Sequence, residues 1–296
     1  MRVGKVKDYE NEKKYGVFDF INCGIMLLVL FVTFYPFIYI ISISFSDTMY
    51  IVQNQVSFYP KGFNMSAYKM LFQSPRIPRA YLNTIIYTTS GVFVNLFLTI
   101  ITAYPISKKH LRGKKYIMLM ILITMFFNGG IIPNYLLVRS LKMIDTIWAL
   151  IIPNAIWTFE LLILKNFFEN VPNELNEAAK IDGASEFRVL FTIFIPLSKA
   201  AIAAIALFYT MGHWNSFFNP MIYLNSMDKL PLQVILRDML IEDTAKTSST
   251  IGEYMSLTPI ALKNATIFIS LLPMLMLYPY IQRFFTKGLM LGAVKG

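Results

Sequence analysis

The chain has 296 residues, of which 56% are hydrophobic and 15% are charged, and its mean hydropathy is +0.53. Soluble domains average about 25% charged residues, so this composition excludes an ordinary soluble protein and indicates a membrane protein. The formal net charge of +10 would suggest nucleic acid in a soluble protein. Here the basic residues stand in short blocks beside apolar segments, so membrane lipid and topology explain them, and we expect no nucleic-acid partner.

Six apolar segments reach the length of about 20 residues that a helix needs to cross a bilayer. Their approximate ranges are 18–45, 84–106, 116–138, 147–164, 200–224 and 265–281. The first is too long for a signal-peptide core and is followed by no small-residue cleavage site, so we expect it to stay in the membrane. The sixth is interrupted by Pro273 and Pro279. We therefore expect an all-α polytopic protein, with six transmembrane helices in a single membrane domain of residues 1–296.

The Lys and Arg residues predict the orientation of these spans, because cytoplasmic loops are enriched in them. They concentrate before the first span, in the loop 108–115 between the second and third spans, and after the sixth span. With six spans, these three regions lie on one side. The N-terminal tail (1–17) and the C-terminal tail (282–296) are therefore expected in the cytoplasm, and the polar stretch 172–197 falls on the same side.

Residues 172–195 have the local design of two short helices lying at an angle on a membrane surface. Pro172 can begin a helix, where its missing N–H costs nothing. Glu174 falls in the first turn, where the helix dipole favours an acid. Gly183 can take the left-handed conformation that ends a helix, and a second amphipathic turn follows at 186–195. The alternative is an ordinary amphipathic linker at the interface.

This stretch resembles the EAA motif of permease subunits of ABC importers, in the version typical of the MalG-like carbohydrate class. The resemblance rests on Glu177-Ala178-Ala179, Asp182-Gly183-Ala184 and Pro196-Leu197. It implies a MetI/MalG-like type I importer fold, in which residues 172–195 are cytoplasmic coupling helices that dock on an ATP-binding subunit. The residues to which it assigns this coupling are Glu177, Ala178, Ala179, Asp182, Gly183, Ala184 and Pro196.

Segments 126–133, 145–150, 212–219 and 287–296 are similar to the LplC/YtcP branch of sugar permeases, which is associated with complex oligosaccharides. The resemblance implies a multi-pass subunit in a bacterial cell membrane. It pairs with a second homologous permease, two ATPase subunits, an external solute-binding protein and an oligosaccharide. The sequence has no P-loop, so we expect no enzymatic activity or cofactor in this chain, with ATP and Mg held by the partner ATPases. One cysteine and two histidines predict no metal site.

Polar side chains within the apolar spans are the candidates for a substrate path, since they are expensive in a bilayer unless they face protein or water. In the fifth span these are His213, Trp214, Asn215 and Asn219. An indole offers an apolar face to a sugar ring, and Asn supplies a donor and an acceptor. The alternative, equally supported, is that His213 and Asn215 cross-link helices at about 1 kcal/mol each and that Trp214 is an interfacial anchor.

The fourth span contains Glu160, with Trp157 one turn earlier, and both are further candidates for the path. An intramembrane carboxylate is a functional hypothesis by default. Glu160 is expected either to line the path or to pair with a base of the partner permease. The alternative is solvation at the inner interface near Lys165. An uncharged polar residue is expected at this position in the family, so Glu160 departs from its pattern.

Three other functions fit less of the sequence. An ABC permease for amino acids or phosphate is disfavoured by the segments 212–219 and 287–296. A secondary transporter predicts inverted repeats and intramembrane ion-binding carboxylates, and neither is evident. A membrane enzyme requires a catalytic constellation, and the sequence contains no motif of this kind.

Overall fold

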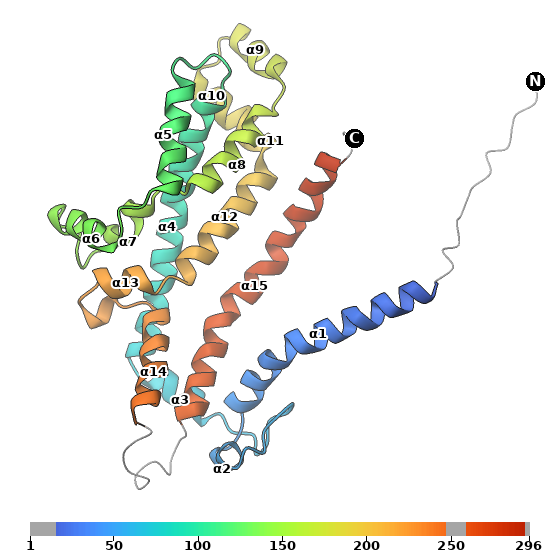
Figure 1. The fold of residues 1–296 in the computed structure, drawn as a ribbon, viewed down its shortest axis with the longest axis vertical. Coiled ribbons are helices and arrows are strands. Elements are labelled where there is room, and N and C mark those ends of the chain that lie inside the picture. The colour runs from blue at the N-terminus through green and yellow to red at the C-terminus, as the bar shows by residue number, and fades with distance from the viewer. Residues whose placement is uncertain (1–15, 247–258, 294–296) are drawn as a thin grey trace, which may run out of the picture. The chain divides into compact units, whose positions relative to one another are not determined.

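The computed structural model describes residues 16–246 and 259–293, and the regular structure in these ranges is entirely helical (Figure 1). By their internal contacts the residues form two compact units, one of residues 1–67 with 255–265 and one of residues 68–254 with 266–296. The all-α class is confirmed. The single domain of residues 1–296 stays a prediction, and most of the N-terminal tail lies outside the described residues.

The first unit contains α1 (Val17–Ser44) and α2 (Thr48–Val52), and most side chains of α1 are exposed and apolar. α3 (Ser66–Gln73) and α15 (Pro259–Ala293) have residues in both units. The other helices belong to the second unit: α4 (Arg76–Ser107), α5 (Lys114–Phe126), α6 (Ile131–Ser140), α7 (Trp148–Ile151), η1 (Ile152–Asn154), α8 (Thr158–Glu169), α9 (Asn173–Ile181), α10 (Glu186–Val189), the π-helix η2 (Leu190–Phe194), α11 (Ile195–Leu197), α12 (Lys199–Trp214), α13 (Phe218–Tyr223), η3 (Met227–Lys229) and α14 (Leu232–Lys246).

Three helical segments within the described residues are straight, long and apolar enough to cross a membrane: α1, α4 and residues 260–277 of α15. Three further candidates are bent pairs. α5 and α6 meet at 114°, residues 148–154 and α8 meet at 54°, and residues 186–197 and α12 meet at 83°. Six spans result when each bent pair counts as one, in agreement with the sequence. The first bend lies at Asn128, Gly129 and Gly130, where the sequence permits a break.

One expectation about helix extent was wrong. The fifth apolar segment was expected to continue to Leu224, but α12 ends at Trp214, and the side-chain amide of the next residue, Asn215, bonds back to the Met211 carbonyl, 2.9 Å away. The sixth segment contains Pro273 and Pro279, and α15 continues through both. Membrane helices tolerate proline where neighbouring groups satisfy the freed carbonyls.

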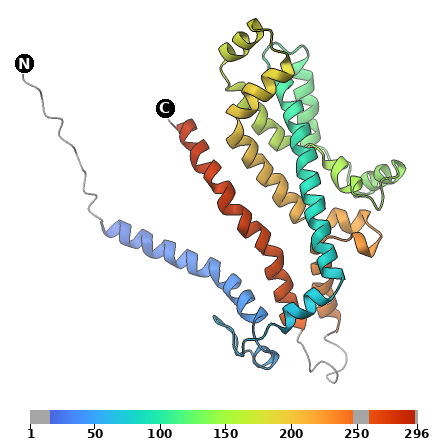
Figure 2. The same cartoon turned by 180° about the vertical axis from the view of Figure 1, so that it is seen from behind.

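The core of the second unit lies where α4 packs against α8 and α12, as the views from both sides show (Figures 1 and 2). Between helices in a membrane, van der Waals packing replaces the hydrophobic effect as the main attraction, so close fit decides stability. One buried cluster joins these helices to the segment after α9; its members include Ala103, Tyr104, Leu161, Leu164, Phe168, Val189, Leu190, Phe194, Ala201, Ile205 and Tyr209.

Glycine makes the closest approach in this packing possible. A Cβ at Gly212 on α12 would overlap the indole of Trp157, and one at Gly91 on α4 would lie 2.6 Å from the ring of His213. The Trp157 indole cannot move aside easily, because Tyr209 meets it edge-on with ring centroids 4.9 Å apart. The indole of Trp157 and the imidazole of His213 are therefore fixed between α4, α8 and α12.

At the far end of α4 from α9, a clamp centred on Asp145 joins the turn after α6 to the segment after α13. The carboxylate of Asp145 accepts hydrogen bonds from the backbone N–H groups of Asn225 and Ser226, and from the Ser226 hydroxyl. Lys229 Nζ lies 2.7 Å from the carboxylate. Side chains of α4 hold the same segment from its other side, since the Asn83 amide donates to the carbonyls of Asp228 and Leu230.

We expect Gly212→Ala to lower the stability of the purified protein by about 1–3 kcal/mol, because the added methyl group overpacks the contact with Trp157. The midpoint of thermal unfolding in detergent measures this loss. Gly24→Ala in α1 is the matched control, since a Cβ there meets nothing within 4 Å. Equal midpoints for the two variants would contradict the described packing.

We expect Asp145→Asn to destabilise the protein by about 1–2 kcal/mol, a value discounted because the clamp is partly exposed. Lys229 and then Ser226 hold the pKa of Asp145 well below its ordinary value of 3.8. A depressed carboxyl pKa stabilises the folded state above the unfolded pKa, and this stabilisation is lost as the pH falls toward the folded pKa. The gap between the unfolding midpoints of wild type and variant should therefore be constant above about pH 4 and narrow below it.

Asp228→Asn is the control for this experiment, because Asp228 holds its neighbours through its backbone carbonyl. If both variants lower the unfolding midpoint equally, or if the difference between wild type and Asp145→Asn widens in acid, the Asp145 clamp is not the source of the lost stability.

Candidate functional site

The EAA-like stretch folds as a helix, a sharp corner and a second helical segment, which we call the coupling segment (residues 172–197). α9 begins after Pro172, and Gly183 lies just past its end with a φ of +75°. The N–H of Gly183 donates to the Lys180 carbonyl over 3.0 Å, and the N–H of Ala184 donates to the Ala179 carbonyl over 2.9 Å. These two bonds are the Schellman motif, which requires a left-handed residue at the corner. The expected pair of angled helices is confirmed.

The alanines of the motif have two different surroundings. Ala179 and Ala184 pack against the buried cluster of α4, α8 and α12, so they attach the corner to the core. Ala178 and Asp182 are exposed, one turn apart on α9. Ile181 beside them has an exposed fraction of 86%, unusually high for an isoleucine. α9 thus presents a small, partly apolar tip on a rigid base.

Pro196 lies at the other end of the coupling segment. It is exposed in α11, next to the 83° bend that leads into α12. Proline fits the first turn of a helix because its missing N–H would have no intrahelical partner there. Pro196 therefore belongs to the bend that connects the coupling segment to α12, and not to the tip.

Lys108, directly after α4, contacts both arms of the coupling segment. Its Nζ donates to the Asn176 side chain on α9 over 2.9 Å and lies 3.8 Å from the Glu186 carboxylate on α10. The same ammonium lies 4.3 Å from the ring centroid of Tyr104 and 4.4 Å from that of Phe194. Burial lowers the pKa of Lys108, and the charge of Glu186 partly opposes this effect.

Glu186 is the second centre of these contacts. Lys180 Nζ lies 2.8 Å from one of its oxygens, and the Tyr104 hydroxyl donates to the other. Tyr104 and Lys108 end α4, Lys180 ends α9, and Glu186 begins α10. One carboxylate thus connects the end of α4 to the coupling segment, about 80 residues away in sequence, and joins α9 to α10 within that segment.

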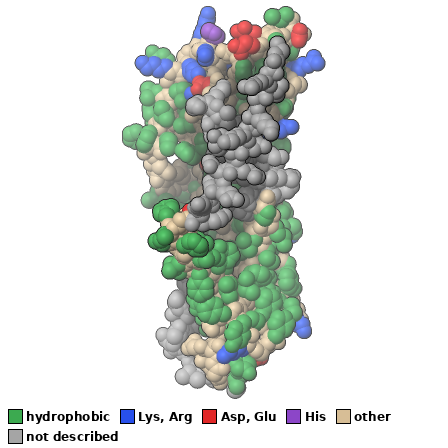
Figure 3. Space-filling view, turned by 90° about the vertical axis from the view of Figure 1, so that its right-hand side faces the viewer, with side chains coloured by type: hydrophobic (Ala, Val, Ile, Leu, Met, Phe, Trp, Pro, Cys, Tyr) green, Lys and Arg blue, Asp and Glu red, His purple; other side chains and the backbone are tan. Residues whose placement is uncertain are grey.

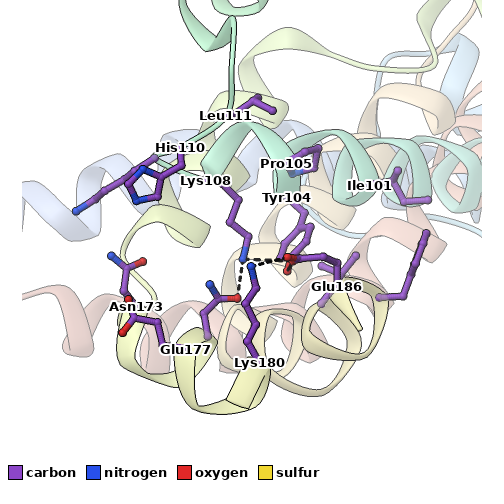
Figure 4. A pocket seen from close by; sticks show the side chains of 14 residues that line it. Ile101, Tyr104, Pro105, Lys108, His110, Leu111, Asn173, Glu177, Lys180 and Glu186 are labelled. Atoms are coloured by element: carbon purple, nitrogen blue, oxygen red, sulfur yellow. Dashed lines mark hydrogen bonds and ion pairs between the residues drawn. The ribbon is translucent and has the colours of Figure 1, made fainter. Parts of the chain in front are cut away.

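A cavity of about 530 Å³ opens beside these contacts, between the loop after α4 and the facing sides of α9 and α10 (Figure 4). Asn173, Asn176, Glu177 and Lys180 line it from α9, at helical spacings of three and four residues. Glu177 therefore lies on a different side of α9 from the tip. It forms no ion pair with another described residue within 4.0 Å.

Charged side chains gather at this end of the second unit (Figure 3). Lys114 at the start of α5 and Lys165 on α8 each lie 2.7 Å from the carboxylate of Glu169. The basic loop 108–115 and the coupling segment thus lie at one end of the unit, as the sequence required of them.

The candidates for a substrate path divide into two groups. Trp157, Glu160 and His213 lie around the contact between α8 and α12, where Trp157 and His213 have ring centroids 6.2 Å apart. Glu160 is buried in the first turn of α8, nine residues before that helix ends at Glu169, and makes no ion pair within the described residues. The Nε2 atom of His213 is buried and has no hydrogen-bond partner among them either.

The second group consists of Trp214, Asn215 and Asn219. Trp214 is buried, and its Nε1–H donates to the Ser270 carbonyl of α15 over 3.1 Å. Asn215 is the exposed C-cap of α12, and Asn219 lies on α13. Trp214 and Asn215 thus have structural partners within this chain, and a role in the path stays a prediction for all six residues. No group of three His, Cys, Asp or Glu residues able to hold a metal occurs in the part of the chain that the structure describes.

Sequence reasoning missed Lys108, Tyr104, Glu186 and Asp145 as organising residues. Their partners are about 70 to 85 positions away in the chain, as the separations of 82 for Tyr104 and Glu186 and 84 for Asp145 and Lys229 show. The basic block 108–115 was noted for its charge alone. Glu186 is the acid that pairs with this basic block, but no spacing rule connects Glu186 to residues 108–115 in the sequence.

Comparison with known proteins agrees with this site. Residues 62–291 match the family of the binding-protein-dependent transport system inner membrane component. The chain is 41% identical over 295 residues to Protein LplC of Bacillus subtilis (strain 168), covering 99% of this chain and all of that protein. It is 38% identical over 285 residues to the polygalacturonan/rhamnogalacturonan transport system permease protein YtcP of the same organism, covering 96% of this chain and all of YtcP.

A solved structure has the same fold. It is a chain in the crystal structure of a bacterial ABC transporter involved in the import of the acidic polysaccharide alginate, with a TM-score of 0.85 and 30% identity. The match covers 92% of this chain and 99% of that one. Helix pattern, coupling segment and relatives therefore agree, and this chain belongs to the binding-protein-dependent transport system inner membrane component family, the permease subunits of ABC importers.

Proposed function

We propose that this chain is one of two permease subunits of an importer for oligosaccharides, driven by ATP hydrolysis in separate ATPase subunits. The observation that carries the proposal is the coupling segment, whose exposed tip stands on a base packed into the core. A partner that grips the tip can move α4, α8 and α12 together, because Ala179 and Ala184 fix the corner to them. A loose joint would dissipate this motion before it reached the spans.

The tip is suited to a protein partner. Ile181 and Phe187 expose 86% and 68% of their surface, and both flank the corner at Gly183. Apolar side chains surrounded by charged ones are typical of protein interfaces, with the apolar residues at the centre. In the proposed transporter the tip enters a recess of the ATPase subunit on the cytoplasmic side, and both chain termini lie on that side as well.

The substrate path requires the second permease. Glu160 is buried without a cation within the described residues, and an unpaired carboxylate at membrane depth is expensive. In the proposed heterodimer it either faces the path or meets a base of the partner. An external binding protein delivers the oligosaccharide to the side opposite α9.

We further propose that the oligosaccharide is acidic. At the α9 end, Lys108, Lys114, Lys165 and Lys180 each lie within 4.0 Å of a carboxylate. On the opposite side of their spans, Arg76, Arg79, Arg139 and Lys142 form no such pair with any described carboxylate. Arg76 and Arg79 bond to the Met227 sulfur and the Asp228 carbonyl, which leave their charges unneutralised, and guanidinium binds carboxylates in a bidentate geometry. YtcP and the alginate importer, named for acidic glycans, agree with this choice.

Reconstitution tests the main proposal. Co-expressed with its partner permease and the ATPase subunits, the chain should take up an oligogalacturonate into proteoliposomes only with ATP and the binding protein. A neutral oligosaccharide of the same length should be a poorer substrate. Transport by the purified chain alone without ATP would refute the importer assignment, and preference for the neutral sugar would refute only the acidic substrate.

We expect graded effects at the corner of the coupling segment. Gly183→Ala should reduce ATP-driven uptake modestly, because the left-handed backbone costs an alanine about 1–2 kcal/mol while its Cβ meets nothing within 4 Å. Gly183→Pro should abolish uptake, because it also removes the N–H that bonds to Lys180 and cannot take a positive φ. Uptake assays at matched membrane levels of each variant measure the series.

Two charge changes separate the tip from the cavity side of α9. Ile181→Asp should prevent the ATPase subunits from co-purifying, because it puts a charge at the centre of the proposed interface. Glu177→Lys should abolish uptake as well, because it replaces a negative charge by a positive one in the cavity beside Lys108. Normal uptake by Gly183→Pro and Glu177→Lys would contradict the coupling role of this segment.

A further inference from the structure

We infer that Lys108 is a positioning residue for energy coupling: it holds the end of α4 to both arms of the coupling segment, so that α4 turns with them. The inference rests on the proposed function. The Lys108 node consists of Lys108, its contacts Tyr104, Asn176, Glu186 and Phe194, and Lys180, which pairs with Glu186; Figure 4 shows it without Phe194.

The chain connectivity explains why such a node is needed. The coupling segment is continuous with α8 on one side and with α12 on the other, so a pull on its tip reaches these two helices through the backbone. α4 is joined to the segment by no peptide bond, since its own chain leads through the loop 108–113 to α5. Side-chain contacts must therefore carry the motion to α4.

The buried cluster supplies part of this connection through apolar contacts, which have no preferred direction. The Lys108 node adds directional contacts. Its ammonium is shared between Asn176 on α9 and Glu186 on α10 at 2.9 and 3.8 Å, so the same charge resists movement of either arm. Tyr104, one turn earlier on α4, binds Glu186 as well, and the connection therefore has two points along α4.

The aromatic rings make the ammonium the centre of the node. Nζ lies 4.3 and 4.4 Å from the ring centroids of Tyr104 and Phe194, so two aromatic faces cover part of the charge not used by Asn176 and Glu186. Cation–π contacts gain strength when the cation is desolvated. Lys109, the next residue, lines the same cavity without a hydrogen bond or ion pair to the described residues, so it is a matched control.

The first test is the coupling ratio of the assembled transporter, which is the amount of oligosaccharide imported per ATP hydrolysed. Lys108→Met keeps the apolar stem but removes the charge, and the ratio should fall about tenfold, a typical coupling effect, while the ATPase subunits still co-purify. Lys109→Met should keep the wild-type ratio, and Lys108→Arg should restore most of it. A wild-type ratio in Lys108→Met, or loss of ATPase co-purification by it, would overturn the inference.

The second test does not depend on the substrate. Spin labels at Arg112→Cys, in the loop after α4, and Glu174→Cys, on α9, report the distance between these elements in a Cys23→Ser background. We expect one narrow distribution with and without trapped ATP, a broad one in Lys108→Met, and a narrow one in Lys109→Met. An unchanged narrow distribution in Lys108→Met would overturn the inference.

Two controls complete the tests. If Lys108→Met does not accumulate in the membrane, Glu186→Gln makes both measurements, since it keeps the side-chain volume and removes the charge that faces Lys108; a narrow distribution with a wild-type ratio would then overturn the inference. The proposed function fails separately, if the unmodified transporter shows no import that depends on ATP. The label distances still test the node in that case.

Discussion

The packing of α4 against α8 and α12 is the interaction on which the rest of the second unit depends. Apolar side chains gain little by leaving lipid for a helix interface, so these helices are held by fit and by a few polar contacts. Gly212 allows the edge of the Trp157 indole to approach α12 closely, and Tyr209 packs against the same indole with ring centroids 4.9 Å apart. The Tyr209 hydroxyl also meets Thr99 of α4 at 2.7 Å. These contacts join α4, α8 and α12 at one point along their length.

This point separates two ends with different electrostatics. At the α9 end, carboxylates pair with the lysines, and the charges serve to join chain segments. At the other end, Asp145 binds Lys229 while several arginines keep no carboxylate partner among the described residues. The ion pairs at the α9 end join chain segments, whereas Arg76 and Arg79 at the other end bond to an uncharged sulfur and a carbonyl.

The sequence predicted most of the fold, because membrane spans are set by local composition. The corner at Gly183 was predictable as well, since the left-handed conformation and the surrounding helix signals are local. The bends were harder to predict, and the end of α12 at Trp214, where the Asn215 amide bonds back to Met211, was not expected.

The site was predictable in its residues and not in their division of labour. The pattern Glu177-Ala178-Ala179 gives no indication that the first faces a cavity, the second the solvent and the third the core. That division depends on how α9 is oriented at the corner, and the Schellman bonds at Gly183 set this orientation. It also explains why two small residues are needed in succession. Ala179 packs against the buried cluster, so the corner lies close to the core, while Ala178 is exposed and leaves room for a partner. A larger residue at Ala179 would separate the tip from the helix it must move.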